Sequence, residues 1–315
     1  MWTDLSPHLR SVLQALFVTF LWSTSWVLIK IGLNDDLPAL TFAGLRYTLA
    51  FACLLLIAVR RPALLVPLRT LSRREWGQLI ILGLVYYAVN QGAQFLGLAM
   101  LPAATVNLLL SLTAVAVSFL GIYLLAERPT LLQWGGVGLY AVGILVYFYP
   151  VSLPTGQLLA VLVVLVGVLA NAVATLLGRS INRGNSLHPL AITTVSMGIG
   201  SIALLVTGIA TQGMPLLSLD NWLLVGWLAL VNTAFAFTLW NHTLRTLSAM
   251  ESSIINNAML VQIPILAWLF LGEHFTWKEG VGIMLAGLGI LAVQLRRLSW
   301  LRLKPPLASR GSSET

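Results

Sequence analysis

The chain has 315 residues, of which 58% are hydrophobic and only 9% are charged, and its mean hydropathy is +0.90. A soluble domain carries about 25% charged residues, so this composition excludes a soluble protein and indicates several membrane-spanning segments. The formal charge of +8 does not indicate nucleic-acid binding, because the basic residues gather at the ends of apolar runs rather than on one polar face.

Hydropathy and turn signals divide the chain into ten apolar segments. A bilayer core needs ~20 apolar residues per helix, and runs of this length lack the alternating pattern of a membrane barrel. We therefore expect an all-α integral membrane protein with ten transmembrane helices, at residues 11–33, 39–59, 76–99, 103–125, 131–149, 156–178, 190–211, 221–244, 249–271 and 277–297. The first span lacks a suitably placed small-residue cleavage site, so we expect it to be retained.

The first expected span carries Trp22 and Trp26 four residues apart, with Lys30 one turn further on. Their indole faces could stack on a flat or cationic substrate, and ordinary packing or anchoring at the membrane interface is the alternative. The second span carries a single charge, Arg46. We expect it to anchor at the interface or to hydrogen-bond another helix, with a contact to a substrate carboxylate as the alternative.

Polar stripes mark four of the later spans. They comprise Tyr87, Asn90, Gln91 and Gln94 in the third, Asn107 and Ser111 in the fourth, Asn241 and His242 in the eighth, and Ser253, Asn256 and Asn257 in the ninth. Polar side chains at membrane depth are costly without partners. Apart from Gln91, they are therefore predicted, together with Trp22 and Trp26, to line a central substrate site. The alternative is that they only hold helices together, at ~0.6 kcal/mol each.

Titratable groups are scarce within the expected spans. His242 is the only histidine deep in one of them and could couple transport to protons, although a structural hydrogen bond is the favoured interpretation. No Asp or Glu lies at the centre of a span, and Glu127 and Glu273 lie at helix ends, where capping or a gate contact is expected. The sequence therefore offers little support for a proton carrier.

Glycines recur along the fifth and tenth spans and permit close approach of helix backbones. They are Gly135, Gly136, Gly138 and Gly143 in the fifth span, and Gly280, Gly282, Gly287 and Gly289 in the tenth. We expect them to pack within the chain, and a homodimer interface is the alternative. The single cysteine, Cys53, excludes an intrachain disulfide.

Lys and Arg residues fall almost entirely on one side of the expected spans. They precede the first span and follow the even-numbered ones, as Arg10, Arg60, Arg61, Arg69, Arg73, Arg74, Arg128, Arg179, Arg183, Arg245, Arg296, Arg297, Arg302, Lys304 and Arg310. Only Lys30 and Lys278 lie on the opposite side. Because basic loops stay in the cytoplasm, both termini are predicted to be cytoplasmic, in the inner membrane.

The chain is also duplicated. The stretch 125–146 recurs at 271–292, where a constant offset of 146 residues pairs Glu127 with Glu273 and a Gly-Ile-Leu run with its copy. Five spans per half is an odd number, so the two repeats would enter the membrane in opposite orientations, as in many secondary transporters. We expect repeats at 1–150 and 151–299, followed by a disordered basic cytoplasmic tail at 300–315.

These features resemble the EamA branch of the drug/metabolite transporter superfamily over essentially the whole chain. The resemblance is carried by FLWSTSWVLIKIGL (20–33), FAGLRYTLA (42–50), and the repeated LLAERPTLLQWGGVGLYAVGIL and FLGEHFTWKEGVGIMLAGLGIL. Pro264 fits the family pattern, whereas its counterpart Ser118 and the Ala126-Glu127 pair depart from it. The resemblance implies ten helices around a central cavity and export of amino acids, other metabolites or drugs.

The function predicted is export of a small organic solute, most plausibly an amino acid or related metabolite, by rocking of the two halves. Export of hydrophobic drugs is the substrate alternative. A membrane-embedded enzyme is a weaker one, because the chain lacks HExxH and GxSxG motifs and its four histidines are scattered. We expect no catalytic residue, metal or cofactor, and partners limited to the solute, membrane lipids and, as an alternative, a second copy of the chain.

Overall fold

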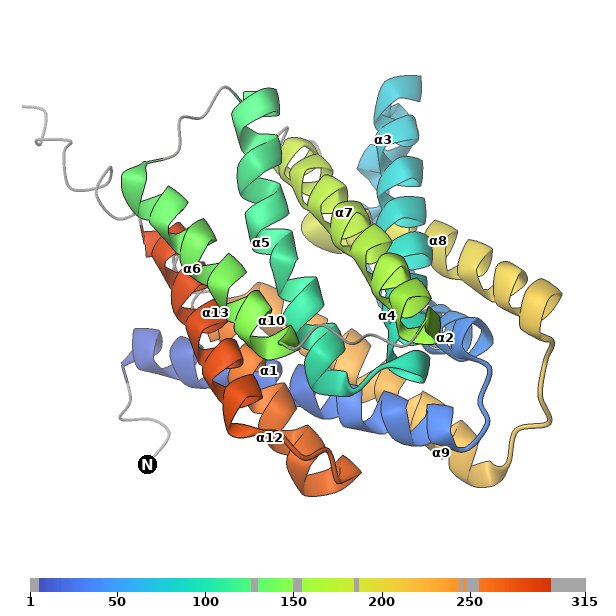
Figure 1. Ribbon diagram of the computed structural model, residues 1–315. Helices are drawn as coiled ribbons and strands as arrows, with labels where there is room; N and C mark the ends of the chain where they lie inside the picture. The colour runs from blue at the N-terminus through green and yellow to red at the C-terminus, as the bar shows by residue number, and fades with distance from the viewer. Residues whose placement is uncertain are drawn as a thin grey trace, which may run out of the picture.

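The computed structural model describes residues 6–125, 130–149, 155–183, 187–243, 246–247 and 255–295 (Figure 1). Every regular element within these ranges is helical. The helices are α1 (Pro7–Asn34), α2 (Ala39–Val59), α3 (Arg73–Gly83), α4 (Gln91–Met100), α5 (Ala103–Leu125), α6 (Leu131–Phe148), α7 (Thr155–Arg183), α8 (Pro189–Gln212), α9 (Leu219–Ala229), α10 (Ala236–Thr243), α12 (Met259–Leu271) and α13 (Trp277–Leu295). Two short 3₁₀ turns, Pro62–Leu64 and Val66–Thr70, connect α2 to α3.

Two π-helical segments interrupt the longer helices. Leu84–Asn90 joins α3 to α4, and Leu230–Phe235 joins α9 to α10, so each expected span continues through its π segment. The two segments begin 146 residues apart, which is the offset that relates the two halves of the sequence. π-Helical turns occur frequently at functional sites.

Within the described ranges, seven helical runs are long and apolar enough to cross a membrane. They are Pro7–Asn34, Ala39–Val59, Arg73–Met100, Leu131–Phe148, Gln157–Gly178, Pro189–Gln212 and Leu219–Trp240, and shorter apolar helices cover Ala103–Val117 and Ile255–Leu271. The expected ranges agree with the observed helices to within a few residues wherever the chain is described. The described part of the chain is therefore all-α, as expected, with helices suited to a membrane.

Several helices begin where the sequence supplies a capping side chain. The Ser6 hydroxyl accepts from the Leu9 N–H at 3.2 Å, directly before Pro7, which is suited to the first helical turn. Ser72 and Glu75 form a reciprocal capping box at the start of α3, with the Glu75 carboxylate 2.8 Å from the Ser72 N–H. These caps fix the observed starts of α1 and α3, which lie a few residues before the expected ones.

Helices α6 and α13 lie side by side along their length (Figure 1). A Cβ atom added at Gly143 would lie 2.5 Å from the Ala286 nitrogen, and one added at Gly289 would lie 2.6 Å from the Gly136 oxygen. At these positions only glycine lets the two backbones touch. Gly143, Gly282 and Gly289 therefore pack the fifth and tenth expected spans against each other within one chain. For Gly135, Gly138 and Gly280 the expectation of packing was wrong, because they face open space.

The outside of the bundle is apolar, and a minority of polar residues is buried among the apolar side chains of its interior. Leu56 and Leu145 are each 63% exposed, whereas the buried residues include Ser23, Arg46 and Asn232. A soluble protein would instead cover its outside with polar groups, which water solvates. In a bilayer the exterior contacts lipid, and polar groups are placed between helices where they find partners.

Candidate functional site

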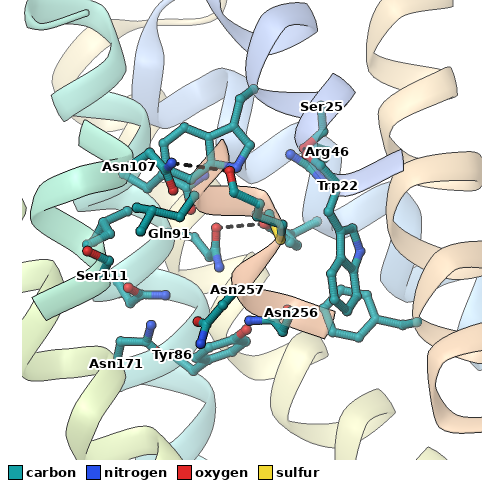
Figure 2. Close-up of a pocket in the computed structure, with 18 residues that line it drawn as sticks. Trp22, Ser25, Arg46, Tyr86, Gln91, Asn107, Ser111, Asn171, Asn256 and Asn257 are labelled. Atoms are coloured by element: carbon teal, nitrogen blue, oxygen red, sulfur yellow. Dashed lines mark hydrogen bonds between the residues drawn. The ribbon is translucent and has the colours of Figure 1, made fainter. Parts of the chain in front are cut away.

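A cavity of about 270 Å³ lies between the helices (Figure 2). Its walls come from both sequence halves, namely from α1, α2, α4 and α5 with the first π segment, and from α7, α10, residues 256–257 and α12. Its lining is dominated by amides, hydroxyls and aromatic rings. A cavity of this size is near the small end of ligand sites, which range over about 300–1,000 Å³, and suits a small solute.

Eight of the predicted site residues line this cavity. They are Trp22, Trp26, Asn90, Gln94, Asn107, Ser111, Asn256 and Asn257. Tyr87 and His242 do not line it: Tyr87 is buried against the rings of Tyr47 and Tyr86, and His242 is exposed near the end of α10. Ser253 and the side chain of Asn241 lie outside the described residues. The structure thus brings together polar residues that are up to 235 positions apart in the sequence.

The cavity also includes lining residues that were not predicted as part of the site. They are Ser25, Arg46, Tyr47, Tyr86, Gln91, Leu110, Asn171, Phe237, Met259 and Leu260. Asn171 is an isolated amide in the long apolar helix α7, a signal that was present in the sequence. Tyr86 lines the cavity in place of Tyr87 within the π segment. A π turn holds more residues than an α turn, so it alters which side chains share a face.

Several lining residues also connect helices. The Asn107 amide donates to the Met259 carbonyl at 3.3 Å, and the Tyr47 hydroxyl donates to Gln91 Oε1 at 2.7 Å (Figure 2). The Ser111 hydroxyl lies 2.9 Å from that of Tyr140 on α6. Lining the cavity and holding the helices together are therefore not exclusive roles, because each amide or hydroxyl has more than one hydrogen-bonding position.

Arg46 is buried, with 4% of its surface exposed, and lines the cavity. Its Nε donates to Thr233 Oγ1 at 3.1 Å, and its guanidinium carbon lies 5.1 Å from the centre of the Tyr47 ring. This confirms the expected hydrogen bond between helices, and protein atoms enclose the side chain. Thr233 belongs to the second π segment and itself donates to the Leu228 carbonyl at 2.8 Å.

One end of the bundle is held by two charged side chains. The Lys30 ammonium donates to the carbonyls of Leu98 at 2.6 Å and Leu101 at 2.9 Å, at the end of α4. The Glu273 carboxylate accepts from the N–H groups of Ala103 at 2.6 Å and Ala104 at 3.3 Å, at the start of α5. We name these four contacts the latch. They complement the helix dipoles and join the α4–α5 connection to α1 and to the segment after α12.

No group of three or more His, Cys, Asp or Glu residues in the described part of the chain could hold a metal ion. The arrangement instead offers hydrogen-bonding groups and aromatic faces around a space for a small molecule. Such a site is suited to binding and release.

Comparison with known proteins gives the family. The model of the EamA-like transporter family matches twice, at residues 9–149 and 158–295. The inner membrane transporter YedA of Escherichia coli is 26% identical, with 94% of this chain and 88% of YedA covered, and the transporter YoaV of Bacillus subtilis is 24% identical over 89% and 95%. An Escherichia coli protein named "Probable amino-acid metabolite efflux pump" is 28% identical, over 91% of this chain and 95% of that protein.

A solved crystal structure shares the fold, with a TM-score of 0.66 at 17% identity, covering 91% of this chain and 98% of that one. The fold, the twofold family match and the named transporters agree with the resemblance found in the sequence. The chain therefore belongs to the EamA-like transporter family of membrane proteins.

Proposed function

We propose that the protein is a secondary transporter that exports small organic solutes, amino acids or related metabolites, across the cytoplasmic membrane by alternating access. The observation that carries the proposal is the polar cavity between the helices, with walls from both sequence halves and a latch at one end of the bundle. A solute site between two halves of a transporter is what alternating access requires. The name of the amino-acid metabolite efflux relative supports this substrate class.

The proposed membrane arrangement is ten helices in two inverted repeats, at 1–150 and 151–299, with a basic cytoplasmic tail at 300–315. The two family matches and the two π segments 146 residues apart support a duplication. The distribution of Lys and Arg supports cytoplasmic termini. In this orientation the latch lies at the non-cytoplasmic end of the bundle.

Rocking of the two halves would then exchange a latched conformation for one in which the latch is broken. Glu273 lies in the second repeat, and the N–H groups it binds lie in the first. Its contacts must break if the repeats separate at that end. The latch would therefore favour the conformation closed to the outside.

Export of hydrophobic drugs is the second candidate. Trp22, Trp26, Tyr86 and Phe237 line the cavity and could bind flat apolar molecules. The cavity volume of about 270 Å³ and the many amides favour a smaller polar solute. We therefore propose amino acids and related metabolites as the substrates, ahead of hydrophobic drugs.

Counterflow in proteoliposomes tests this function. Liposomes containing the purified protein are preloaded with amino acids, amines or dyes, and uptake of the labelled solute is followed with and without a pH gradient. We expect exchange of at least one amino acid. Exchange of dyes alone would support the drug exporter, and no exchange by folded protein would overturn the transport proposal.

Two substitutions test the cavity as the site. We expect Asn107→Ala and Asn256→Ala to lower exchange about 3- to 10-fold, because each removes a hydrogen-bonding group from the cavity wall. Size-exclusion profiles should show folded protein for both. Asn34→Ala, at the exposed end of α1, is the matched control and should exchange normally. Unchanged exchange by both cavity variants would remove these residues from the site.

A further inference from the structure

The cavity contains a buried cation without an anionic partner. Arg46 is the only Lys, Arg, Asp or Glu among the described residues that line it. Its Nε is bound to Thr233, and its two terminal nitrogens have no hydrogen-bond partner within the described ranges. Lys30 and Glu273, by contrast, are engaged in the latch.

A guanidinium at membrane depth is costly unless it is paired. The Tyr47 ring, 5.1 Å away, and the Thr233 hydroxyl each offset part of this cost, but neither carries a negative charge. The two terminal nitrogens of an arginine form a planar fork that matches the two oxygens of a carboxylate. An anionic group of the solute would therefore find in Arg46 the partner that the protein itself does not supply.

Other residues that line the cavity indicate which second group of the solute could bind beside its carboxylate. In Figure 2, Trp22 and Ser25 lie on the same side of the cavity as Arg46, with Asn171 across from them. The indole faces are suitable neighbours for an ammonium group. A cation without a carboxylate would instead meet the unneutralised charge of Arg46.

We propose that Arg46 is the specificity-determining residue of the transporter and that it binds the carboxylate of the exported solute. The inference rests on the proposed export function and requires that the substrate carry a carboxylate. Zwitterionic amino acids meet this requirement, and so do carboxylic acids without an amino group. Amines and cationic drugs do not.

The test compares matched solutes in the full-length protein. Each standard amino acid is compared in counterflow with its carboxamide, its decarboxylated amine and its desamino acid. We expect the wild type to prefer the carboxylate over the carboxamide about 10- to 100-fold, the range for one charge-assisted, bidentate contact. Arg46→Gln should abolish this preference, and Arg46→Lys should retain part of it. The desamino acid reports whether the ammonium is also recognised.

Thr233→Val is the matched control for a purely structural role of Arg46. It removes the hydrogen bond between α2 and the second π segment but leaves the guanidinium in place. We expect it to keep the carboxylate preference even if it lowers the yield of protein. The same loss of preference in Thr233→Val as in Arg46→Gln would assign Arg46 to helix packing and overturn the proposal.

The remaining outcomes separate the two proposals. A wild type that exchanges amino acids and their amines or carboxamides equally well would overturn the role of Arg46 and leave export standing. If folded wild type exchanges no member of the panel, the export function fails. A change in tryptophan fluorescence on adding the same solutes, compared between wild type and Arg46→Gln, then tests Arg46 by binding. If Arg46→Gln does not fold, the proposal is tested by comparing the carboxylate preference of the wild type with that of Arg46→Lys.

Discussion

Glu273→Gln is expected to open the latched end of the transporter. The carboxylate accepts hydrogen bonds from the N–H groups of Ala103 and Ala104, and the neutral amide of glutamine retains one acceptor but no charge. Hydrogen bonds to charged groups contribute about 1.5–3 kcal/mol each. Losing most of one such contact would shift the equilibrium between the latched and open conformations about tenfold or more.

Thiol labelling measures this shift. Ser25→Cys, which lines the cavity, is introduced into a Cys53→Ala background, and a membrane-impermeant thiol reagent is added from the outside. We expect labelling to be about tenfold faster when Glu273→Gln is also present. Glu279→Gln is the control, because Glu279 only caps its own helix through Thr276. Equal labelling rates with Glu273→Gln and Glu279→Gln would show that the latch does not restrict access.

Gly143→Leu is expected to prevent stable packing of α6 on α13. A Cβ atom at this position would lie 2.5 Å from the Ala286 nitrogen and 2.7 Å from the Gly282 oxygen, both of which are backbone atoms that cannot rotate away. Overpacking typically lowers the free energy of unfolding by about 1–3 kcal/mol. Because this substitution would force two backbones apart, we expect a loss of stability at or above the upper end of that range. We expect a lower thermal midpoint and a loss of monodisperse protein in detergent.

Gly138→Leu is the matched control on the same helix, because a Cβ atom added there meets nothing within 4 Å. Both substitutions change helix propensity equally, so the difference between them isolates the contact with α13. If the two variants melt at the same temperature, close packing of α6 on α13 contributes little. Light scattering on the same samples tests the alternative of a homodimer, which Gly138→Leu would weaken if that face were the interface.

Much of the cavity was predictable because a polar side chain within a long apolar run is itself a signal. Asn107 and Asn256 stand out in this way, and both line the cavity. Tyr87 is a residue for which this signal gave the wrong prediction. An α-helical period places it on the polar stripe, but the π segment places Tyr86 at the cavity instead. Hydropathy does not distinguish a π turn from an α turn.

Arg46 is a second residue whose position the sequence did not determine. Its cost in hydrocarbon indicates that it needs a partner or an interface, and the sequence leaves both alternatives open. The structure selects burial between α2 and the second π segment, where Thr233 is 187 positions away in the sequence. It also brings Arg46 into one cavity with residues of α1, α5 and α12. This position in the cavity is the basis for proposing that Arg46 binds the carboxylate of the solute.

The sequence by itself determined the membrane class, the helix positions and the family, because each depends on local composition, on the length of apolar runs or on motifs along one chain. Only the tertiary structure decided which polar residues share the cavity, which glycines bring α6 and α13 together, and that Lys30 and Glu273 both hold the α4–α5 connection. These contacts join residues far apart in the chain. Their geometry depends on how the helices cross and rotate against each other, which hydrophobic periodicity does not specify.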